Sequence, residues 1–361
     1  MNASAFFPFN ENIMQALQLK QYGGPDHIAF AELPRPAPGP GELLVQVHAV
    51  GLNPIDYLIP RGDFKPILKL RLPATLGSDL AGIVVAVGSA VTRFKVGDAV
   101  YASIFDTPYG SLAEFAVVPE PAAAMKPANL DFVQAASIPM VGLTAWQAMH
   151  ERMHLKPGQK VFIPAGSGGI GTFAIQLAKH LGARVGTTTS TANVELVRGL
   201  GADEVVDYKQ QPFEQVLRDY DAVLGTVRGD GLEKALRIVK PGSHVVSLIG
   251  PPDAAFARAR GMNLVLKLVF GLLSRKIIGL AKRRGADYAF HFVRPDGSQL
   301  AQIAGLLEAG SIRPVIDKVF PFLEAKQALA YLAQGRARGK VVVQLPVNAI
   351  TSAGNGADSC G

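Results

Sequence analysis

The sequence predicts an α/β protein with two cores: an antiparallel β domain and a parallel, doubly wound sheet flanked by helices. The chain has 361 residues, of which 48% are hydrophobic and 18% charged, and this is enough for two domains of about 100 to 200 residues each. Short valine-rich runs separated by glycine and proline come first, and strands then alternate with helices. These two patterns are typical of an antiparallel barrel and of a parallel sheet, respectively.

The β domain is expected to begin at residue 14 and to run to residue 139. Runs such as LAGIVVAVGSAV and SLAEFAVVP recur there, with turn signals about every 8 to 12 residues, as in a small barrel. Valine-rich segments return around one helix near the end of the chain, so residues 296–346 are expected to rejoin this domain. The two ends, 1–13 and 347–361, offer little to bury and are expected to be flexible.

The parallel sheet is expected within residues 140–295, where apolar strands alternate with helical segments. Such alternation is typical of a doubly wound sheet in which helices connect parallel strands. The six strands that we expect are 161–164, 184–189, 204–208, 222–227, 244–249 and 288–293.

A glycine-rich turn joins the first of these strands to a helix. The stretch VFIPAGSGGIG contains Gly166, Gly168 and Gly171 in the spacing G-x-G-x-x-G. This spacing suits a tight turn, a close approach of backbone N–H groups to a pyrophosphate, and close packing of helix against strand. Glycine turns also close strand–helix junctions that bind nothing. Here a helix and a β-branched strand follow and complete a βαβ unit, which favours a dinucleotide site.

The second strand of this unit ends in hydroxyl groups rather than in an acid. Chains that bind NAD usually place Asp or Glu about 20 residues after the turn, where it accepts hydrogen bonds from the ribose 2′-hydroxyl. Thr189, Ser190 and Thr191 stand there instead, and the next acid, Glu195, falls within the following helix. Small hydroxyls donate to a 2′-phosphate that an acid would repel, so we expect NADPH as cofactor. An alternative role for Ser190 or Thr191 is to cap that helix, and the two roles are compatible.

Cysteine content and charge narrow the class of protein. The single cysteine, Cys360, excludes an internal disulfide and a cysteine-rich metal site, and the first residues lack the basic start of a secretory signal. We therefore expect a cytoplasmic protein. The net charge of +7 arises largely between residues 254 and 286, which hold eight cations and no acid. A basic run is typical of nucleic-acid binding, of an anionic membrane surface or of a solvated face. No DNA-reading motif accompanies it, so we expect no nucleic-acid partner.

Several motifs together resemble the zinc-free quinone oxidoreductase branch of the medium-chain dehydrogenase/reductase superfamily, over roughly residues 14 to 346. They are VGLNPIDY, LGSDLAGIVVAVGSAVTRFKVGDAVYA, GSLAEFAVVP, GLTAW, the glycine turn followed by QLAK, LGADEVVDY and GKVVV. The resemblance implies a GroES-like β-barrel domain, interrupted by a Rossmann domain that binds NADPH, with the active site in the cleft between them.

Zinc-dependent relatives place a Cys, a His-Glu pair, and a second Cys or an acid at three places in these motifs. This chain has Asn53, Ser78 with Asp79, and Met140 near those places. Catalytic zinc typically needs three protein ligands, so we expect no metal site. Without a Lewis acid, ordinary alcohol oxidation is not expected, and reduction of an electron-poor acceptor remains.

The resemblance implies hydride transfer from NADPH to a small-molecule acceptor, either a quinone or the β-carbon of a conjugated enone. The family's Asn-Pro-x-Asp loop, which faces the nicotinamide ring, contains the two catalytic candidates, Asn53 and Tyr57. We expect the Tyr57 hydroxyl to donate a hydrogen bond to the acceptor oxygen, although a stacking or packing role is the alternative. Asp56 is expected to be a structural turn acid. A different class of function is a non-catalytic NADPH-binding structural or sensor protein.

The cofactor contacts implied by the resemblance are spread over the second half of the chain. Relatives commonly carry Lys three residues beyond the serine of the second strand, where this chain has Asn193, so a moderate preference for NADPH is expected. The candidates are Thr144, Gly166, Ser167, Gly168, Gly169, Ile170, Gly171, Ser190, Tyr208, Thr226, Ile249, Gly250, Phe290 and Phe292, with Arg336 and Lys340 as further choices.

A long apolar and basic segment, residues 261–284, stands before the last expected strand. At 100° per residue a polar stripe leaves most of its circumference apolar, and we expect this apolar surface to be buried. The stripe consists of Asn263, Lys267, Gly271, Ser274, Arg275 and Lys282. Its charges argue against a transmembrane span, and an interfacial membrane helix is an alternative that we do not favour. We expect instead that the segment covers the cleft or lies beside the interface of a homodimer, because relatives dimerise through the edge of the Rossmann sheet.

Overall fold

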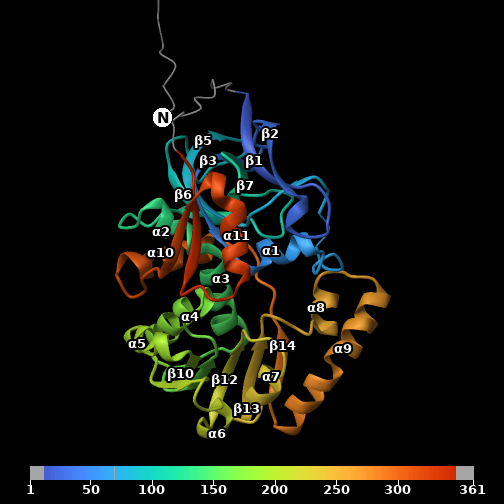
Figure 1. The fold of residues 1–361 in the computed structure, drawn as a ribbon, viewed down its shortest axis with the longest axis vertical. Helices are drawn as coiled ribbons and strands as arrows, with labels where there is room; N and C mark the ends of the chain where they lie inside the picture. Colours follow the sequence, from blue (N-terminus) through green and yellow to red (C-terminus); the bar gives the residue numbers. More distant parts are fainter. Residues whose placement is uncertain (1–11, 69, 347–361) are drawn as a thin grey trace, which may run out of the picture.

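The computed structural model describes residues 12–68 and 70–346, and its chain forms two lobes, one above the other in Figure 1. The upper lobe contains the strands of the β domain, and the lower lobe contains the parallel sheet with its helices. Both parts of the predicted fold class are therefore confirmed. The ends expected to be flexible lie outside the described residues, except that the first strand, β1 (Ile13–Leu19), already begins at Ile13.

The upper lobe is built from two mainly antiparallel sheets. The smaller sheet has the order β2 (Ile28–Pro34), β1 and β4 (Ala74–Thr75). The larger has seven strands in the path β15–β16–β3–β5–β6–β8, with β7 paired to β3. Their bounds are β3 (Glu42–Leu52), β5 (Asp79–Val87), β6 (Ala99–Ser103), β7 (Phe115–Pro119), β8 (Ala123–Met125), β15 (Ile316–Pro321) and β16 (Lys340–Gln344).

The lower lobe contains six parallel strands in the order β11–β10–β9–β12–β13–β14. In chain order this is 3-2-1-4-5-6, the arrangement of doubly wound dinucleotide-binding sheets. The bounds are β9 (Lys160–Ile163), β10 (Arg184–Thr189), β11 (Glu204–Asp207), β12 (Tyr220–Gly225), β13 (Val239–Ser247) and β14 (Asp287–Phe290). All six expected strands are present. The last is shorter than expected because its partner β13 ends at Ser247, which pairs with Phe290.

Helices connect and cover these sheets. In the upper lobe they are α1 (Pro54–Arg61), α2 (Phe132–Ala136), α10 (Gly297–Glu308) and α11 (Ala325–Ala333), with the 3-10 turns η1 (Pro25–His27), η2 (Glu120–Ala122) and η5 (Phe322–Glu324). Around the parallel sheet they are α3 (Pro139–Gln147), the π-helical η3 (Ala148–Arg152), α4 (Gly169–His180), η4 (Thr191–Asn193), α5 (Val194–Gly199), α6 (Phe213–Val216), α7 (Gly231–Ala235), α8 (Ala254–Ala259) and α9 (Leu264–Arg283).

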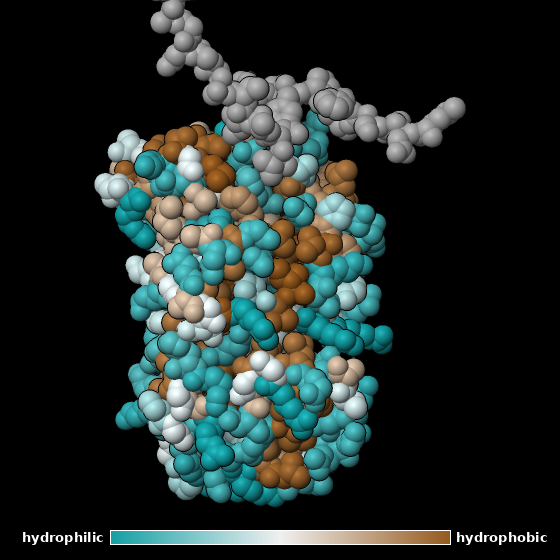
Figure 2. Space-filling view, turned by 90° about the vertical axis from the view of Figure 1, so that its left-hand side faces the viewer, coloured by the Kyte–Doolittle hydropathy of each residue, from teal (hydrophilic) through white to brown (hydrophobic). Residues whose placement is uncertain are grey.

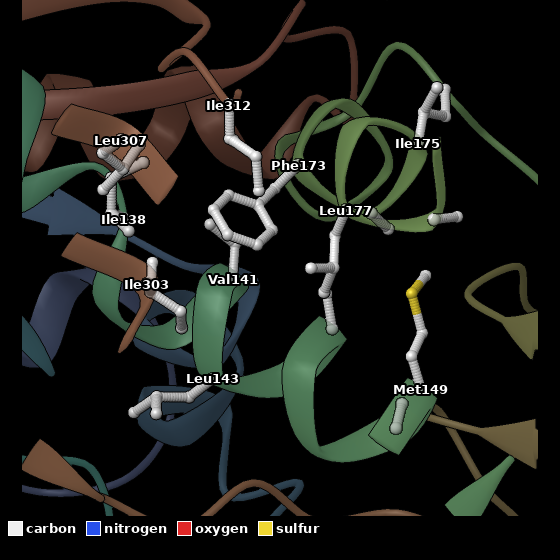
Figure 3. Packing of buried hydrophobic residues seen from close by; sticks show 14 of the residues in the cluster. Ile138, Val141, Leu143, Met149, Phe173, Ile175, Leu177, Ile303, Leu307 and Ile312 are labelled. Carbon is white, nitrogen blue, oxygen red and sulfur yellow. The ribbon is translucent and has the colours of Figure 1, made fainter. Parts of the chain in front are cut away.

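One hydrophobic core extends from the parallel sheet into the β domain. Figure 3 shows Phe173 and Leu177 of α4 beside Val141 of α3, with Ile303 of α10 nearby. Buried residues of the upper lobe, among them Tyr101, belong to the same cluster. The Tyr101 hydroxyl donates a hydrogen bond of 2.6 Å to the Leu300 carbonyl of α10. Shared packing of this kind fixes the two lobes relative to each other, as a cleft between them requires.

One side of the molecule has a mainly hydrophilic surface over the lower lobe. In the view of Figure 2, hydrophilic residues cover most of the lower lobe, and hydrophobic residues lie in narrower bands between them. The long helix α9 lies on the opposite side, at the right of Figure 1. A search of the described helices finds none with the length and apolar character needed to cross a membrane.

Candidate functional site

The glycine turn after β9 is held in a strained and tightly packed shape. Ala165 has a positive φ of 55°, and a Cβ on Gly166 would lie 2.2 Å from Thr187 Oγ1. A Cβ on Gly171 would lie 2.5 Å from the Ala165 carbonyl oxygen. These two glycines are therefore required by the packing of turn, strand and helix. At Gly168 the nearest atom would be 3.4 Å away, which leaves space on that side of the turn.

The helix that follows the turn presents an uncapped N-terminus. Gly168 is the N-cap of α4, and no side chain caps the helix. The turn residues Ser167, Gly168, Gly169 and Ile170 are half-buried, so their backbone is accessible. Free N–H groups and the positive end of a 12-residue helix suit a phosphate, so this part of the chain fits a dinucleotide.

A cavity of about 560 Å³ lies at the carboxyl ends of β9, β10 and β12, beside this turn. Ligands of open α/β sheets bind at this edge, where the strand order reverses between β9 and β12. Tyr208, a cofactor residue predicted from the sequence, lines the cavity together with Thr188, Lys209 and Gly225. Thr226 does not line it, and its hydroxyl donates instead to the Pro164 carbonyl oxygen at 2.8 Å.

The hydroxyl cluster at the end of β10 connects with the turn. Thr189 Oγ1 donates to Ser167 Oγ at 3.0 Å, and Asn193 Nδ2 donates to the hydroxyls of Ser167 and Ser190, each at 3.2 Å. Ser190 makes no side-chain capping bond, and α5 has none at its N-terminus, so the capping alternative is wrong. Asn193 is uncharged and so cannot supply the positive charge of the lysine that relatives carry there. Its amide instead holds the hydroxyls of Ser167 and Ser190 close to each other.

Two residues near this cluster were missed by sequence reasoning. Asp207 pairs with Thr189 across β10 and β11, and its Oδ2 accepts a hydrogen bond of 2.6 Å from Thr191 Oγ1. That bond lowers the pKa of Asp207, so an ionised acid stands beside the hydroxyls. Lys209 lies two residues further on and lines the cavity. The expected sheet already placed β10 beside β11. Aligning the ends of these two strands would have put Asp207 opposite Thr189 and Lys209 close by, so this signal was available in the sequence.

A second site is built around the start of α1. Asn53 N–H donates to Asp56 Oδ2 at 2.7 Å, as in a capping box, and Ser78 Oγ donates to Asp56 Oδ1 at 3.2 Å. Asp56 is therefore the structural turn acid that the sequence predicted. Burial raises the pKa of Asp56 to about 7, and Asp79 adds to this shift.

Lys340 completes a buried polar cluster with Asn53 and Asp79. Its Nζ donates to Asn53 Oδ1 at 2.6 Å and lies 3.7 Å from Asp79 Oδ2, while Asn53 Nδ2 donates to that oxygen at 2.9 Å. Asp79 also accepts the Met140 N–H, and its side chain is fully buried. Burial raises the pKa of Asp79 and lowers that of Lys340, and in both residues the attraction between the two charges opposes the shift.

Lys340 also stands next to the glycine turn. Gly339 N–H donates to the Ser167 carbonyl oxygen at 2.9 Å, and Gly339 forms a bridge with Gly168. The strand β16 carries Lys340 into this position because it pairs with β3, which leads into Asn53. The segment therefore connects the turn of the cofactor site with the loop that precedes α1.

The cluster does not fit a zinc ion. Asn53, Ser78 with Asp79, and Met140 stand near the places where zinc-dependent relatives have ligands, and an ammonium group already bonds to Asn53 and faces Asp79. A second cation there would meet strong repulsion. Within residues 12–68 and 70–346, no group of three or more His, Cys, Asp or Glu side chains is arranged to hold a metal.

Tyr57 lies on α1, half-buried, with its ring 5.4 Å from the guanidinium of Arg61. Its hydroxyl has no hydrogen-bond partner among the described residues, so it is free to donate to a bound molecule. Beside the same helix, a cavity of about 260 Å³ is lined by Asp56, Leu68, Phe105 and others. This cavity is a candidate acceptor site, although the two catalytic candidates, Asn53 and Tyr57, are not among the residues that line it.

The edge of the cleft is closed by contacts between the lobes. The rings of Phe105 and Phe292 are 5.0 Å apart, and Arg260 forms an ion pair of 2.6 Å with Asp106. Phe292 is thus placed near the acceptor cavity, whereas Phe290 is buried in an aromatic cluster with Phe256.

The remaining predicted cofactor residues are not gathered at one point. Thr144 is buried in α3, and Ile249 and Gly250 line a separate cavity of about 270 Å³ next to Val227. Arg336 is exposed after α11. Their roles stay predictions.

Comparison with known proteins agrees with this arrangement. Residues 39–128 match a family profile described as "Alcohol dehydrogenase GroES-like domain", and residues 200–343 match one described as "Zinc-binding dehydrogenase". The chain is 36% identical to NAD(P)H oxidoreductase RTN4IP1, mitochondrial, of Danio rerio, over 94% of each chain. It is 33% identical to the chloroplast envelope quinone oxidoreductase homolog of Arabidopsis thaliana, covering 92% of this chain and 98% of that one.

Another relative and a solved structure are also similar to this chain over most of its length. The 2-methylene-furan-3-one reductase of Solanum lycopersicum is 35% identical, over 91% of this chain and 79% of its own length. The quinone oxidoreductase from Coxiella burnetii superposes with a TM-score of 0.79 at 30% identity, covering 92% of this chain and all of that one. The expectation of a cytoplasmic protein is wrong, because relatives of this similarity carry the names of mitochondrial and chloroplast proteins, which point to an organelle.

Proposed function

Because the chain belongs to the medium-chain dehydrogenase/reductase superfamily and is an oxidoreductase that uses a nicotinamide cofactor, we propose that it transfers a hydride from NADPH to a quinone without zinc. The observation that carries this proposal is the ammonium of Lys340 between Asn53 and Asp79, where a catalytic metal would have to bind. An acceptor that is already electron-poor needs no metal to polarise it.

The residues at the start of α1 have distinct roles in this proposal. A bound nicotinamide supplies the hydride. The free hydroxyl of Tyr57 donates a hydrogen bond to the acceptor oxygen as negative charge develops on it. Asn53 is held on both sides of its amide, by Lys340 and by Asp79, and so fixes the start of α1 and the position of Tyr57.

The preference for NADPH rests on the end of β10. Ser190 supplies a hydroxyl that only accepts within the chain, and Lys209 supplies a cation at the neighbouring cavity. The hydroxyls of Thr189 and Thr191 already donate to Ser167 and Asp207, and the carboxylate of Asp207 opposes a phosphate. The balance favours NADPH moderately. Ser190→Asp should weaken NADPH binding by about 1 to 3 kcal/mol, as judged from charge-assisted hydrogen bonds, and leave NADH binding equal or better. A wild-type protein that prefers NADH would contradict this assignment.

A conjugated enal or enone is the second candidate acceptor. It is favoured by the similarity to proteins named 2-methylene-furan-3-one reductase and NADPH-dependent alkenal/one oxidoreductase. Measuring kcat/KM with a naphthoquinone and with a short enal, each with NADPH and NADH, decides between the two acceptors. Turnover of neither acceptor would refute both. A non-catalytic role is not retained, because the chain is an enzyme by its relatives.

The state of assembly that we propose is a homodimer formed through the outer edge of β14. This strand ends the parallel sheet, and its backbone on the outer side pairs with no other described strand. Pairing with a second copy would satisfy those groups. Light scattering that shows a monomer at micromolar concentration would refute the dimer. The names of the relatives support an organelle as the location.

A further inference from the structure

The long helix α9 is firmly attached to the parallel sheet by one narrow face. That face consists of Phe270, Ser274, Ile277 and Ala281, all of them buried. Phe270 stacks on Phe256 of α8, with ring centroids 6.3 Å apart. At the start of the helix, Asn263 accepts a hydrogen bond of 2.9 Å from the Leu266 N–H, which caps the first turn. The side of α9 that faces away from the sheet is therefore held in a fixed position.

The outward surface is apolar over the first half of the helix, and nothing in the described single chain covers it. Ser274, from the expected polar stripe, is fully buried instead. Six aliphatic side chains are exposed on the outward side, which we call the apolar face of α9: Leu264 (70%), Val265 (67%), Leu268 (61%), Val269 (41%), Leu272 (69%) and Leu273 (57%). Contiguous apolar exposure of this kind marks a surface that contacts something else.

The second half of the helix is basic. Arg275, Lys282, Arg283 and Arg284 are exposed and have no ion pair in the described part of the chain, while Lys276 pairs with Glu233 at 2.7 Å. No acid occurs between residues 254 and 286. A partner of α9 must therefore offer both an apolar surface and negative charge.

We propose that α9 docks this protein onto the surface of a bilayer that contains anionic lipid. The apolar face enters the boundary between headgroups and acyl chains, and the cations of the second half contact headgroup phosphates. A second copy of the chain fits less well, because residues 254–286 contain no acid that could pair with the exposed cations of α9. This proposal takes up the interfacial membrane helix, the alternative that the sequence alone did not favour.

Flotation of the full-length protein with vesicles tests the docking. Vesicles of phosphatidylcholine alone are compared with vesicles that contain about one third phosphatidylglycerol, an amount that gives a strongly negative surface. Wild-type protein should float with the anionic vesicles, and binding should fall steeply with salt. The double variant Leu268→Ser/Leu272→Ser should bind at least about tenfold more weakly, because apolar groups are removed from the buried face. Arg275→Gln and Lys282→Gln should each cost roughly fivefold.

Matched controls keep this test independent of folding and of the enzyme reaction. Leu323→Ser changes a leucine that is 77% exposed in the upper lobe, far from α9 in sequence, and should not alter flotation. All variants should keep wild-type NADPH affinity, which shows that they are folded. Failure to float with anionic vesicles would overturn the proposal. So would a dimer, seen by light scattering, that the double serine variant dissociates, because a second copy would then cover the apolar face.

Discussion

Substitution of Lys340 by methionine tests whether the buried cluster depends on its positive charge. Lys340 is 4% exposed and Asp79 fully buried, so neither charge is screened by water. Lys340→Met leaves the Asp79 carboxylate without its cation in the interior, and breaking a buried pair in this way costs about 3 to 5 kcal/mol. Asp79→Asn leaves an unpaired ammonium and should cost a similar amount.

The double variant Lys340→Met/Asp79→Asn separates charge pairing from simple packing. With both charges removed, the new amide at position 79 still offers an oxygen to the N–H groups of Asn53 and Met140, so most of the loss should be recovered. We expect the loss of unfolding free energy in the double variant to be smaller than the sum of the two single losses by at least about 2 kcal/mol. This coupling lies in the range seen for contacting residues.

Urea unfolding, followed by tryptophan fluorescence and circular dichroism, measures these differences. The control is Lys326→Met on α11, where the lysine is exposed and the expected change is within about 0.5 kcal/mol. A Lys340→Met variant within about 1 kcal/mol of wild type would refute the argument from a buried pair. Additive single effects would refute it as well, since they would mean that the two charges do not interact.

Three further predictions concern the candidate site and its surroundings. Tyr57→Phe should lower kcat/KM for the acceptor by about tenfold or more, because it removes the hydroxyl that donates to the developing charge, and it should leave NADPH affinity unchanged. Tyr331→Phe on α11 is the control. An equal loss of kcat/KM in the control would refute the role of Tyr57. Dialysis against a chelator should leave turnover unchanged, and elemental analysis should find no stoichiometric zinc, because the positive charge of Lys340 beside Asn53 and Asp79 would repel a metal ion. Burial lowers the pKa of His291 to about 4, and neither ring nitrogen has a partner among the described residues. The folded state favours the neutral imidazole of His291. Its contribution to the free energy of unfolding is therefore fully present above about pH 6.5 and is lost as the pH falls toward 4, by at most about 3 kcal/mol. His291→Phe should remove this part of the acid sensitivity in thermal unfolding between these pH values, and an unchanged pH profile would contradict it.

The fold was predictable because its signals are local. Each of the six parallel strands is an apolar run bounded by turn residues, and the glycine turn marks where the first strand passes into α4. Pairing that depends on distant segments was not predictable in the same way. Lys340 reaches Asn53 because β16 pairs with β3, a contact between residues 287 positions apart, and nothing near Lys340 in the sequence indicates its partner.

The orientation of α9 shows a different limit of sequence reasoning. A helix that is apolar around most of its circumference has no single face that must be buried, so its polar stripe did not reveal which side packs. Ser274 lies on the packed side because its hydroxyl donates to the Phe270 carbonyl oxygen at 2.7 Å within the same helix. A serine satisfied in this way loses little by burial, so its polarity was a poor guide.

The position of Lys340 also explains why this site differs from a zinc site by more than its missing ligands. Placing cysteine at Asn53 and histidine at Ser78 would still leave an ammonium group whose Nζ lies 2.6 Å from the present Asn53 oxygen and 3.7 Å from Asp79. A divalent cation at that point would face a buried positive charge, and the low dielectric of the interior strengthens this repulsion. The neighbouring Gly339 is bonded to Ser167 of the glycine turn, so the backbone at Lys340 is fixed beside this turn. The positive charge that opposes a metal and the connection between the glycine turn and Asn53 thus both depend on the same strand, β16.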